Sequence, residues 1–180
     1  DCLILTNHTF KESYYKLLAG STGYFHQISG ASDGGAALQS YSQSKQEFAL
    51  LETRTPTVSG LEVAHRIRKD NPDAAVLMVS DYWSPCDAYL INYLRLNGCI
   101  PEADVWKMKP GEAVEAVVSG RRYLSRCYDR SLKQLFQVPF IIHKVLGPVE
   151  RLLLSYIGAH LDDEAIAARL DIPLQAVTSR

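Results

Sequence analysis

The sequence lacks several features that would assign a protein to a class at once. No apolar run approaches the roughly 18 residues that a membrane span needs, and no signal peptide is visible. The 180 residues include 19 basic and 20 acidic side chains, so the chain as a whole is neither a polycation nor an acidic tail. These absences predict a cytoplasmic globular protein with no membrane contact.

Cysteine and histidine are also sparse and scattered. The four cysteines form no C-x-x-C pair, and the five histidines form no H-x-x-x-H pair. Without such pairs, neither a zinc site nor a disulfide framework is expected. We expect free thiols, no metal site and no cofactor.

The first two thirds of the chain alternate between strand-like and helix-like segments. Apolar runs predict strands at residues 2–5, 24–28, 48–51 and 75–79, with helical patterns between them. Such alternation predicts a parallel sheet with helices on both faces, in the doubly wound order 2-1-3-4-5. Sites in these sheets lie at the carboxyl ends of strands, where Thr6-Asn7, Glu52 and Ser80 fall.

Residues 49–63 read ALLETRTPTVSGLEV. This segment resembles the phosphoacceptor segment of bacterial response-regulator receiver domains, which runs roughly LLDLRMPGMSGLEV. The resemblance implies a CheY-like (flavodoxin-like) α/β fold with five parallel strands. It also places Glu52 where the family has the aspartate that accepts a phosphoryl group.

The resemblance implies four further pocket parts: two acids after the first strand that hold Mg²⁺, a hydroxyl after the fourth and a lysine after the fifth. Here the two acids are replaced by Thr6 and Asn7, while Ser80 keeps the hydroxyl. Lys109 imitates the lysine but lies too far along the chain. We therefore expect a degenerate pocket that works without phosphorylation. We interpret Glu52 as a solvated strand-end residue; the alternatives are a built-in phosphate mimic and a working phosphoreceiver.

The carboxy-terminal residues have a purely helical pattern. Asp162 suits the N-cap of a helix, residues 171–173 suit a turn, and residues 174–180 suit a further helix with Val177 buried. A short helix, a turn and a second helix predict a small all-α helix-turn-helix domain, whose second helix normally enters the major groove of DNA.

Residues 146–180 read LGPVERLLLSYIGAHLDDEAIAARLDIPLQAVTSR and resemble the DNA-binding domain of LuxR/GerE (NarL-type) regulators without a gap. The resemblance implies DNA contacts from Leu174, Gln175, Thr178, Ser179 and Arg180. It divides the chain into a receiver-like domain at 1–120, a linker at 121–140 and a helix-turn-helix domain at 141–180. The family's fourth helix is absent, so we expect the domain to be truncated at its carboxyl end.

Together the two resemblances imply an atypical, pseudo-receiver response regulator that acts as a transcription regulator and has no catalytic residues. Its partners would be DNA and a second copy of the chain. The aromatic residues of segment 82–96 offer an interaction face; the alternative, equally open for Tyr89 and Tyr93, is that these rings pack in the core. From residue 141 onward, however, four cations stand against five anions, which predicts weak and salt-sensitive DNA binding. The alternative is an interaction module that titrates a kinase or another regulator without binding DNA.

Overall fold

The computed structural model describes residues 1–106, 111–137, 146–147, 149–150, 153–154, 156 and 161–178. The chain divides into two compact units, Asp1–Gln134 and Leu135–Arg180, which are described separately below. The predicted linker at 121–140 overlaps both units; its residues 138–140 lie outside the described ranges, as does Lys109. No described helix is long and apolar enough to cross a membrane.

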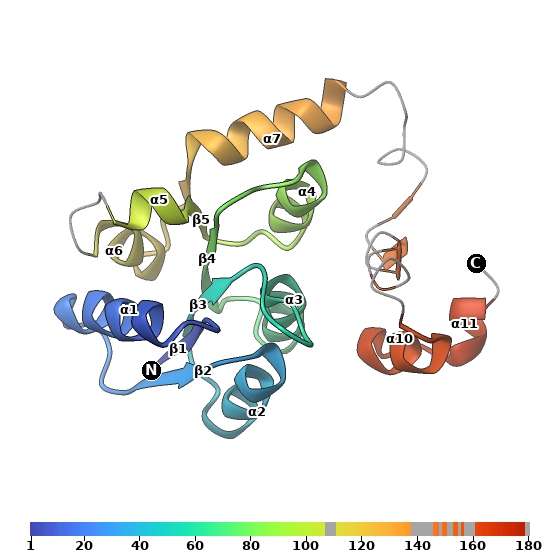
Figure 1. Ribbon diagram of the computed structural model, residues 1–180, viewed down its shortest axis with the longest axis horizontal. Coiled ribbons are helices and arrows are strands. Elements are labelled where there is room, and N and C mark those ends of the chain that lie inside the picture. The colour runs from blue at the N-terminus through green and yellow to red at the C-terminus, as the bar shows by residue number, and fades with distance from the viewer. Residues whose placement is uncertain are drawn as a thin grey trace. The chain divides into compact units, whose positions relative to one another are not determined.

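The first unit contains a parallel sheet of six strands in the order β2-β1-β3-β4-β5-β6, which confirms the predicted fold class and strand order (Figure 1). The strands are β1 (Cys2–Leu5), β2 (Ile28–Ala31), β3 (Phe48–Glu52), β4 (Ala75–Ser80), β5 (Gly98–Pro101) and β6 (Tyr123–Leu124). The sixth strand was not predicted, because two residues paired with one edge leave no periodic signal.

The predicted position of the second strand, at residues 24–28, is wrong. The strand begins at Ile28, which pairs with Cys2 of β1. Phe25, which precedes the strand, packs on the core from a loop instead, and its ring centroid lies 5.0 Å from that of Phe48. The apolar character of Phe25 therefore reflects burial and not strand pairing.

Helices cover both faces of the sheet (Figure 1). In the first unit they are α1 (Thr9–Ser21), α2 (Gly34–Ser44), α3 (Gly60–Asp70), α4 (Pro85–Tyr93), α5 (Glu102–Val105), α6 (Glu112–Val118) and α7 (Arg126–Gln137). Helices α1, α5 and α6 lie on one face, where Tyr15, Leu18 and Val114 pack on apolar strand residues. Helices α2, α3 and α4 lie on the other (Figure 1). The central strands are buried on both sides, which explains their apolar, non-alternating sequence.

The connection between β3 and α3 lies tightly over the end of β3. Ser59 caps α3 by accepting a hydrogen bond from the Glu62 backbone N–H at 3.2 Å. Gly60 follows, and a Cβ atom there would lie 1.9 Å from the Glu52 carbonyl oxygen. Only glycine permits this approach, which fixes the backbone beside the Glu52 side chain.

Two buried side chains of α7 form hydrogen bonds with the segment around α4. The Tyr128 hydroxyl donates to the Ala88 carbonyl oxygen at 3.2 Å, and the Ser131 hydroxyl donates to the Trp83 carbonyl oxygen at 2.8 Å. Residues 126–134 of the predicted linker thus belong to a helix of the first unit.

In the second unit the described helices are α10 (Asp163–Leu170) and α11 (Leu174–Thr178). Asp162 caps α10 as predicted, accepting a hydrogen bond from the Ala165 N–H at 2.7 Å. The turn after α10 begins at Asp171, whose φ of 55° is left-handed. Ile166, Leu170 and Val177 are buried and supply the apolar contacts of this helix pair.

Candidate functional site

The carboxyl ends of the central strands surround an open pocket of about 210 Å³. Its lining comprises Asn7, His8, Lys11, Glu52, Thr53, Arg54, Val79, Ser80, Asp81 and Glu102. The structure thus brings together three of the four predicted pocket residues. Thr6 is not among them: it is buried, and its Oγ1 accepts a hydrogen bond from the His8 N–H at 3.3 Å.

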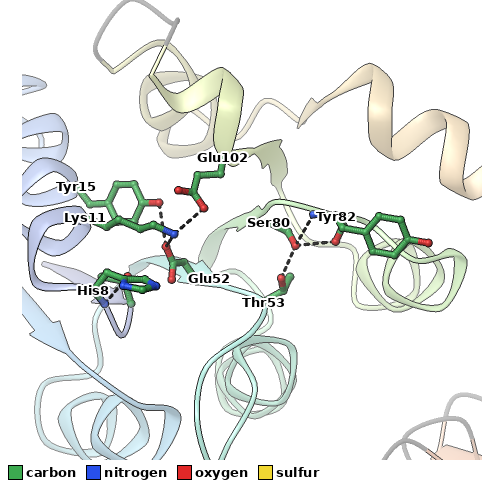
Figure 2. Close-up of polar contacts among 9 residues, drawn as sticks. His8, Lys11, Tyr15, Glu52, Thr53, Ser80, Tyr82 and Glu102 are labelled. Atoms are coloured by element: carbon green, nitrogen blue, oxygen red, sulfur yellow. Dashed lines mark hydrogen bonds and ion pairs between the residues drawn. The ribbon is translucent and has the colours of Figure 1, made fainter.

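A lysine from α1 lies between two carboxylates in this pocket. The Nζ atom of Lys11 is 3.3 Å from Oε1 of Glu52 and 2.6 Å from Oε2 of Glu102. The Tyr15 hydroxyl, one turn further along α1, donates to the same Glu52 oxygen at 3.1 Å. Figure 2 shows Lys11 and Tyr15 reaching Glu52 from the same helix.

Burial and the neighbouring charges shift the proton affinities of these groups. Partial burial lowers the pKa of Lys11, but the hydrogen bond to Glu102 and the two carboxylate charges outweigh it, so its pKa lies above the ordinary value. Burial, and then the charge of Glu52, raises the pKa of Tyr15. Burial and a hydrogen bond with Asp81 raise the pKa of Glu102, against the opposing effect of Lys11. Lys11 therefore remains a cation and Tyr15 a hydroxyl donor near neutral pH.

The hydroxyl at the end of β4 is also engaged. Thr53 donates to Ser80 Oγ at 2.6 Å, and Ser80 donates to the Tyr82 carbonyl oxygen at 2.7 Å (Figure 2). At the rim, the guanidinium of Arg54 lies 5.6 Å from the centre of the Tyr82 ring. These contacts connect the ends of β3 and β4 and hold the loop that follows β4.

The expectation that Glu52 is a solvated strand-end residue is wrong. Only 6% of its surface is exposed, because α1 covers it with Lys11 and Tyr15. After β5, where the receiver resemblance implies a lysine, the first residue is Glu102. The pocket thus has a cation on α1 and an acid after β5.

The pocket does not fit the Mg²⁺ ion that the resemblance implies. Mg²⁺ requires several oxygen ligands in a tight octahedron. Here the two residues after β1 are uncharged, and an ammonium group already lies against the Glu52 carboxylate. Among the described residues, no three His, Cys, Asp or Glu side chains are placed to hold a metal ion.

The site also contains residues that were not predicted from the sequence, among them Lys11, Tyr15, Thr53, Asp81 and Glu102. Lys11 and Tyr15 are four residues apart on α1, so they share the face that the helix turns toward the sheet. Their spacing of one helical turn was the sequence signal that could have identified them as a pair. Glu102 immediately follows β5, a strand whose bounds were not predicted from the sequence.

The predicted DNA-contacting residues lie on α11 and at its carboxyl end. The side chains of Leu174, Gln175 and Thr178 are exposed, while Val177 is buried. The Thr178 hydroxyl is directed back to the Leu174 and Gln175 carbonyl oxygens, at 3.4 and 3.3 Å. Ser179 and Arg180 lie outside the described residues.

The aromatic residues of segment 82–96 separate into two groups. Trp83 is buried, whereas Tyr82 and Tyr93 are more than half exposed. The rings of Tyr89 and Tyr93 stack with centroids 6.4 Å apart. Part of this predicted interaction face therefore belongs to the core.

No protein-family model matches the chain. Over 99 residues, 55% of this chain, it is 28% identical to the probable transcriptional regulatory protein TcrX of Mycobacterium tuberculosis. That match spans only 39% of the relative's length.

Two solved structures resemble the chain at lower identity. A two-component response regulator of the LuxR family from Aurantimonas sp. SI85-9A1 has a TM-score of 0.61 and 21% identity, covering 74% of this chain and 94% of that one. The response regulator RcsB in a complex with DNA has a TM-score of 0.64 and 15% identity, covering 99% and 86%. These similarities establish the CheY-like fold.

Proposed function

We propose that this chain is a DNA-binding transcription regulator of the two-component type, related to LuxR/GerE regulators. The observation that carries the proposal is the geometry of α10, the turn at Asp171 and α11. This arrangement buries Val177 and leaves Gln175 and Thr178 exposed on one short helix. The similarity to RcsB, whose structure was solved with DNA, supports the same interpretation.

In this proposal α11 lies in the major groove. Gln175 reads an adenine through its amide, and Thr178 contacts base edges or phosphate with Leu174, Ser179 and Arg180 beside it. The region supplies few cations, so a single copy binds weakly and loses affinity steeply with salt. We infer that the regulator acts in the cytoplasm as a homodimer, because two copies on adjacent half-sites double the available contacts.

We infer further that the receiver-like unit acts without phosphorylation. The carboxylate at the phosphoacceptor position is buried against Lys11 and Tyr15, so an incoming phosphoryl donor would have to displace both. The Ser80 hydroxyl is occupied by Thr53 and Tyr82. An internal ion pair thus stands where the family has a metal-dependent acceptor, and the unit's role is to assemble the regulator.

Enrichment from a random duplex library tests the DNA-binding function. We expect the full chain to enrich a defined sequence at low salt, with affinity that falls as salt rises. Gln175→Ala should weaken binding to the enriched site by about 1–3 kcal/mol. Gln39→Ala, which changes an exposed glutamine on α2, serves as the matched control and should leave binding unchanged.

The same experiment addresses the alternative function. If the chain binds the enriched duplex no better than random duplex at low salt, the regulator proposal fails. The excess of acidic residues after residue 141 would then favour a module that titrates a kinase or another regulator. Binding to DNA that is equally weakened by Gln39→Ala would also contradict the proposed role of α11.

A further inference from the structure

Positive charge is concentrated in one short part of the chain, residues 121–133. This segment has five cations and one anion. Residues 1–120 have ten cations against fourteen anions, and residues 134–180 have four against five. A cluster of one charge sign in a chain that is otherwise slightly acidic is typical of a surface that binds a polyanion.

Three of these cations share one side of helix α7. Arg126, Arg130 and Lys133 are separated by four and then three residues, so they form a single stripe along the helix, and all three are exposed. We call these three residues the basic stripe. The stripe covers about 10 Å of helix, a length over which one DNA strand presents about three phosphates. Arg121 and Arg122 add two exposed cations just before β6.

The opposite side of α7 is held against the first unit (Figure 1). Tyr128 and Ser131, half a turn away from the basic stripe, are buried and donate to the carbonyl oxygens of Ala88 and Trp83. The stripe therefore faces outward before any partner arrives. A helix that lies in a membrane surface needs its other side free to enter the lipid, so this arrangement favours a polyanion in solution.

The charge of the basic stripe is available to a partner. Elsewhere on the first unit cations pair with acids, as Lys16 does with Glu12 at 2.6 Å. Among the described residues, by contrast, the stripe cations form no ion pair. Two acids are near: Asp129 follows on α7, and Asp104 lines a pocket together with Arg126.

We propose that the basic stripe binds the phosphate backbone of the duplex DNA that α11 reads. The proposal rests on the proposed function, because α11 is what selects the DNA. Neutralising phosphates supplies most of the affinity of DNA-binding proteins, and residues 141–180 have too few cations for this task. The chain continues from α7 into the second unit, so contact by α11 raises the effective concentration of DNA at the stripe. Phosphate contacts carry no sequence information, so the stripe adds affinity and not specificity.

Fluorescence anisotropy with labelled duplexes, over a series of salt concentrations, tests the basic stripe in the full chain. Combining Arg130→Gln with Lys133→Gln should weaken binding about tenfold at low salt, for the enriched duplex and for random duplex alike. The slope of log affinity against log salt should become shallower by about 2, because each lost phosphate contact contributes roughly 0.9. Both side chains are exposed, so the fold should be unchanged, which far-ultraviolet circular dichroism checks.

The matched control removes the same charge from the far side of the first unit. Lys45→Gln combined with Lys69→Gln changes two exposed lysines at the ends of α2 and α3 and should leave the salt slope as in the wild type. An equal loss of affinity in both double variants would overturn the inference, because the effect would then follow from net charge and not from contact with the stripe.

The same measurements separate this inference from the proposed function. A chain that enriches a sequence and binds it equally well without the stripe charges would refute the stripe alone. A chain that binds random duplex through the stripe but enriches no sequence would refute the proposed function alone.

A lipid surface is the remaining polyanion to compare. Vesicles of phosphatidylcholine with phosphatidylglycerol should not bind the chain at the salt concentration where duplex DNA does. Vesicle binding that the Arg130→Gln and Lys133→Gln pair abolishes, with duplex binding unchanged, would overturn the inference.

Discussion

Lys11 of α1 forms an ion pair with Glu52 at the end of β3, with their charged atoms 3.3 Å apart. The two residues are far apart in the sequence, and the pair is largely shielded from water. The Glu52 carboxylate thus has its counter-ion within the same chain. This buried ion pair connects α1 to the end of β3.

Replacing Lys11 should destabilise the first unit. Lys11→Met leaves the Glu52 and Glu102 carboxylates without their cation, and we expect a loss of about 1–3 kcal/mol in the free energy of unfolding. Urea denaturation near neutral pH measures this change. Lys16→Met is the control, since Lys16 pairs with Glu12 at a far more exposed site and should cost less than about 0.5 kcal/mol. Equal effects from the two substitutions would contradict a structural role for Lys11.

Shortening Glu52 should not restore phosphorylation. Glu52→Asp supplies the family's acceptor residue but keeps Lys11, Thr6 and Glu102 in place, so the pocket still does not fit Mg²⁺. Incubation with acetyl phosphate and Mg²⁺, followed by intact-mass spectrometry, should show no added phosphoryl group on this variant or on the wild type. Mg²⁺-dependent labelling of the wild type that Glu52→Gln abolishes would refute the phosphorylation-independent proposal.

Stability should fall as the solution becomes alkaline. Burial raises the pKa of Cys2 and of Cys99 from 9.0 to about 12, and that of Tyr128 from 10.0 to about 12. Above pH 9 the unfolded chain therefore releases protons that the folded chain retains, so unfolding becomes more favourable as the pH rises toward 12.

Urea denaturation at a series of pH values measures this loss. Each such group contributes a slope of up to about 1.4 kcal/mol per pH unit between its unfolded and folded pKa. Cys99→Ser should reduce the slope, because it removes one of these buried groups. Stability that stays constant from pH 8 to pH 11 would show that the thiols and Tyr128 are not buried.

Removing the cap of α10 should loosen the proposed DNA-binding unit. Asp162→Ala deletes the acceptor for the Ala165 N–H, and such caps are worth about 1 kcal/mol. Hydrogen exchange of the α10 amides should accelerate, while the strands of the first unit keep their protection. Asp163→Ala, which removes only a charge in the first turn, should have the smaller effect. Identical hydrogen-exchange rates of the α10 amides in the two variants would contradict the capping role of Asp162.

Local patterns were enough to predict most of the fold. Apolar runs located β1, β3 and β4, because a strand buried on both faces leaves a continuous apolar signal. Asp162 and the turn at Asp171 were predicted for a similar reason, since helix ends depend on neighbouring residues. The apolar pattern predicted a strand wrongly around Phe25, because this residue packs on Phe48 from a loop. It was absent for β6, which exists only through pairing with β5.

Short-range patterns in the sequence specified most of the strands, the segment around Glu52 and the helix pair near the carboxyl end, and the strand order followed from the doubly wound fold class that they predicted. They also located Asn7, Glu52 and Ser80 at strand ends, because local signals mark where strands stop. The surroundings of Glu52, in contrast, followed from the three-dimensional arrangement alone.

The pairing of Glu52 with Lys11, and of Lys11 with Glu102, depends on how α1 and β5 are placed around β3. No local pattern encodes distances between segments that are remote in the chain.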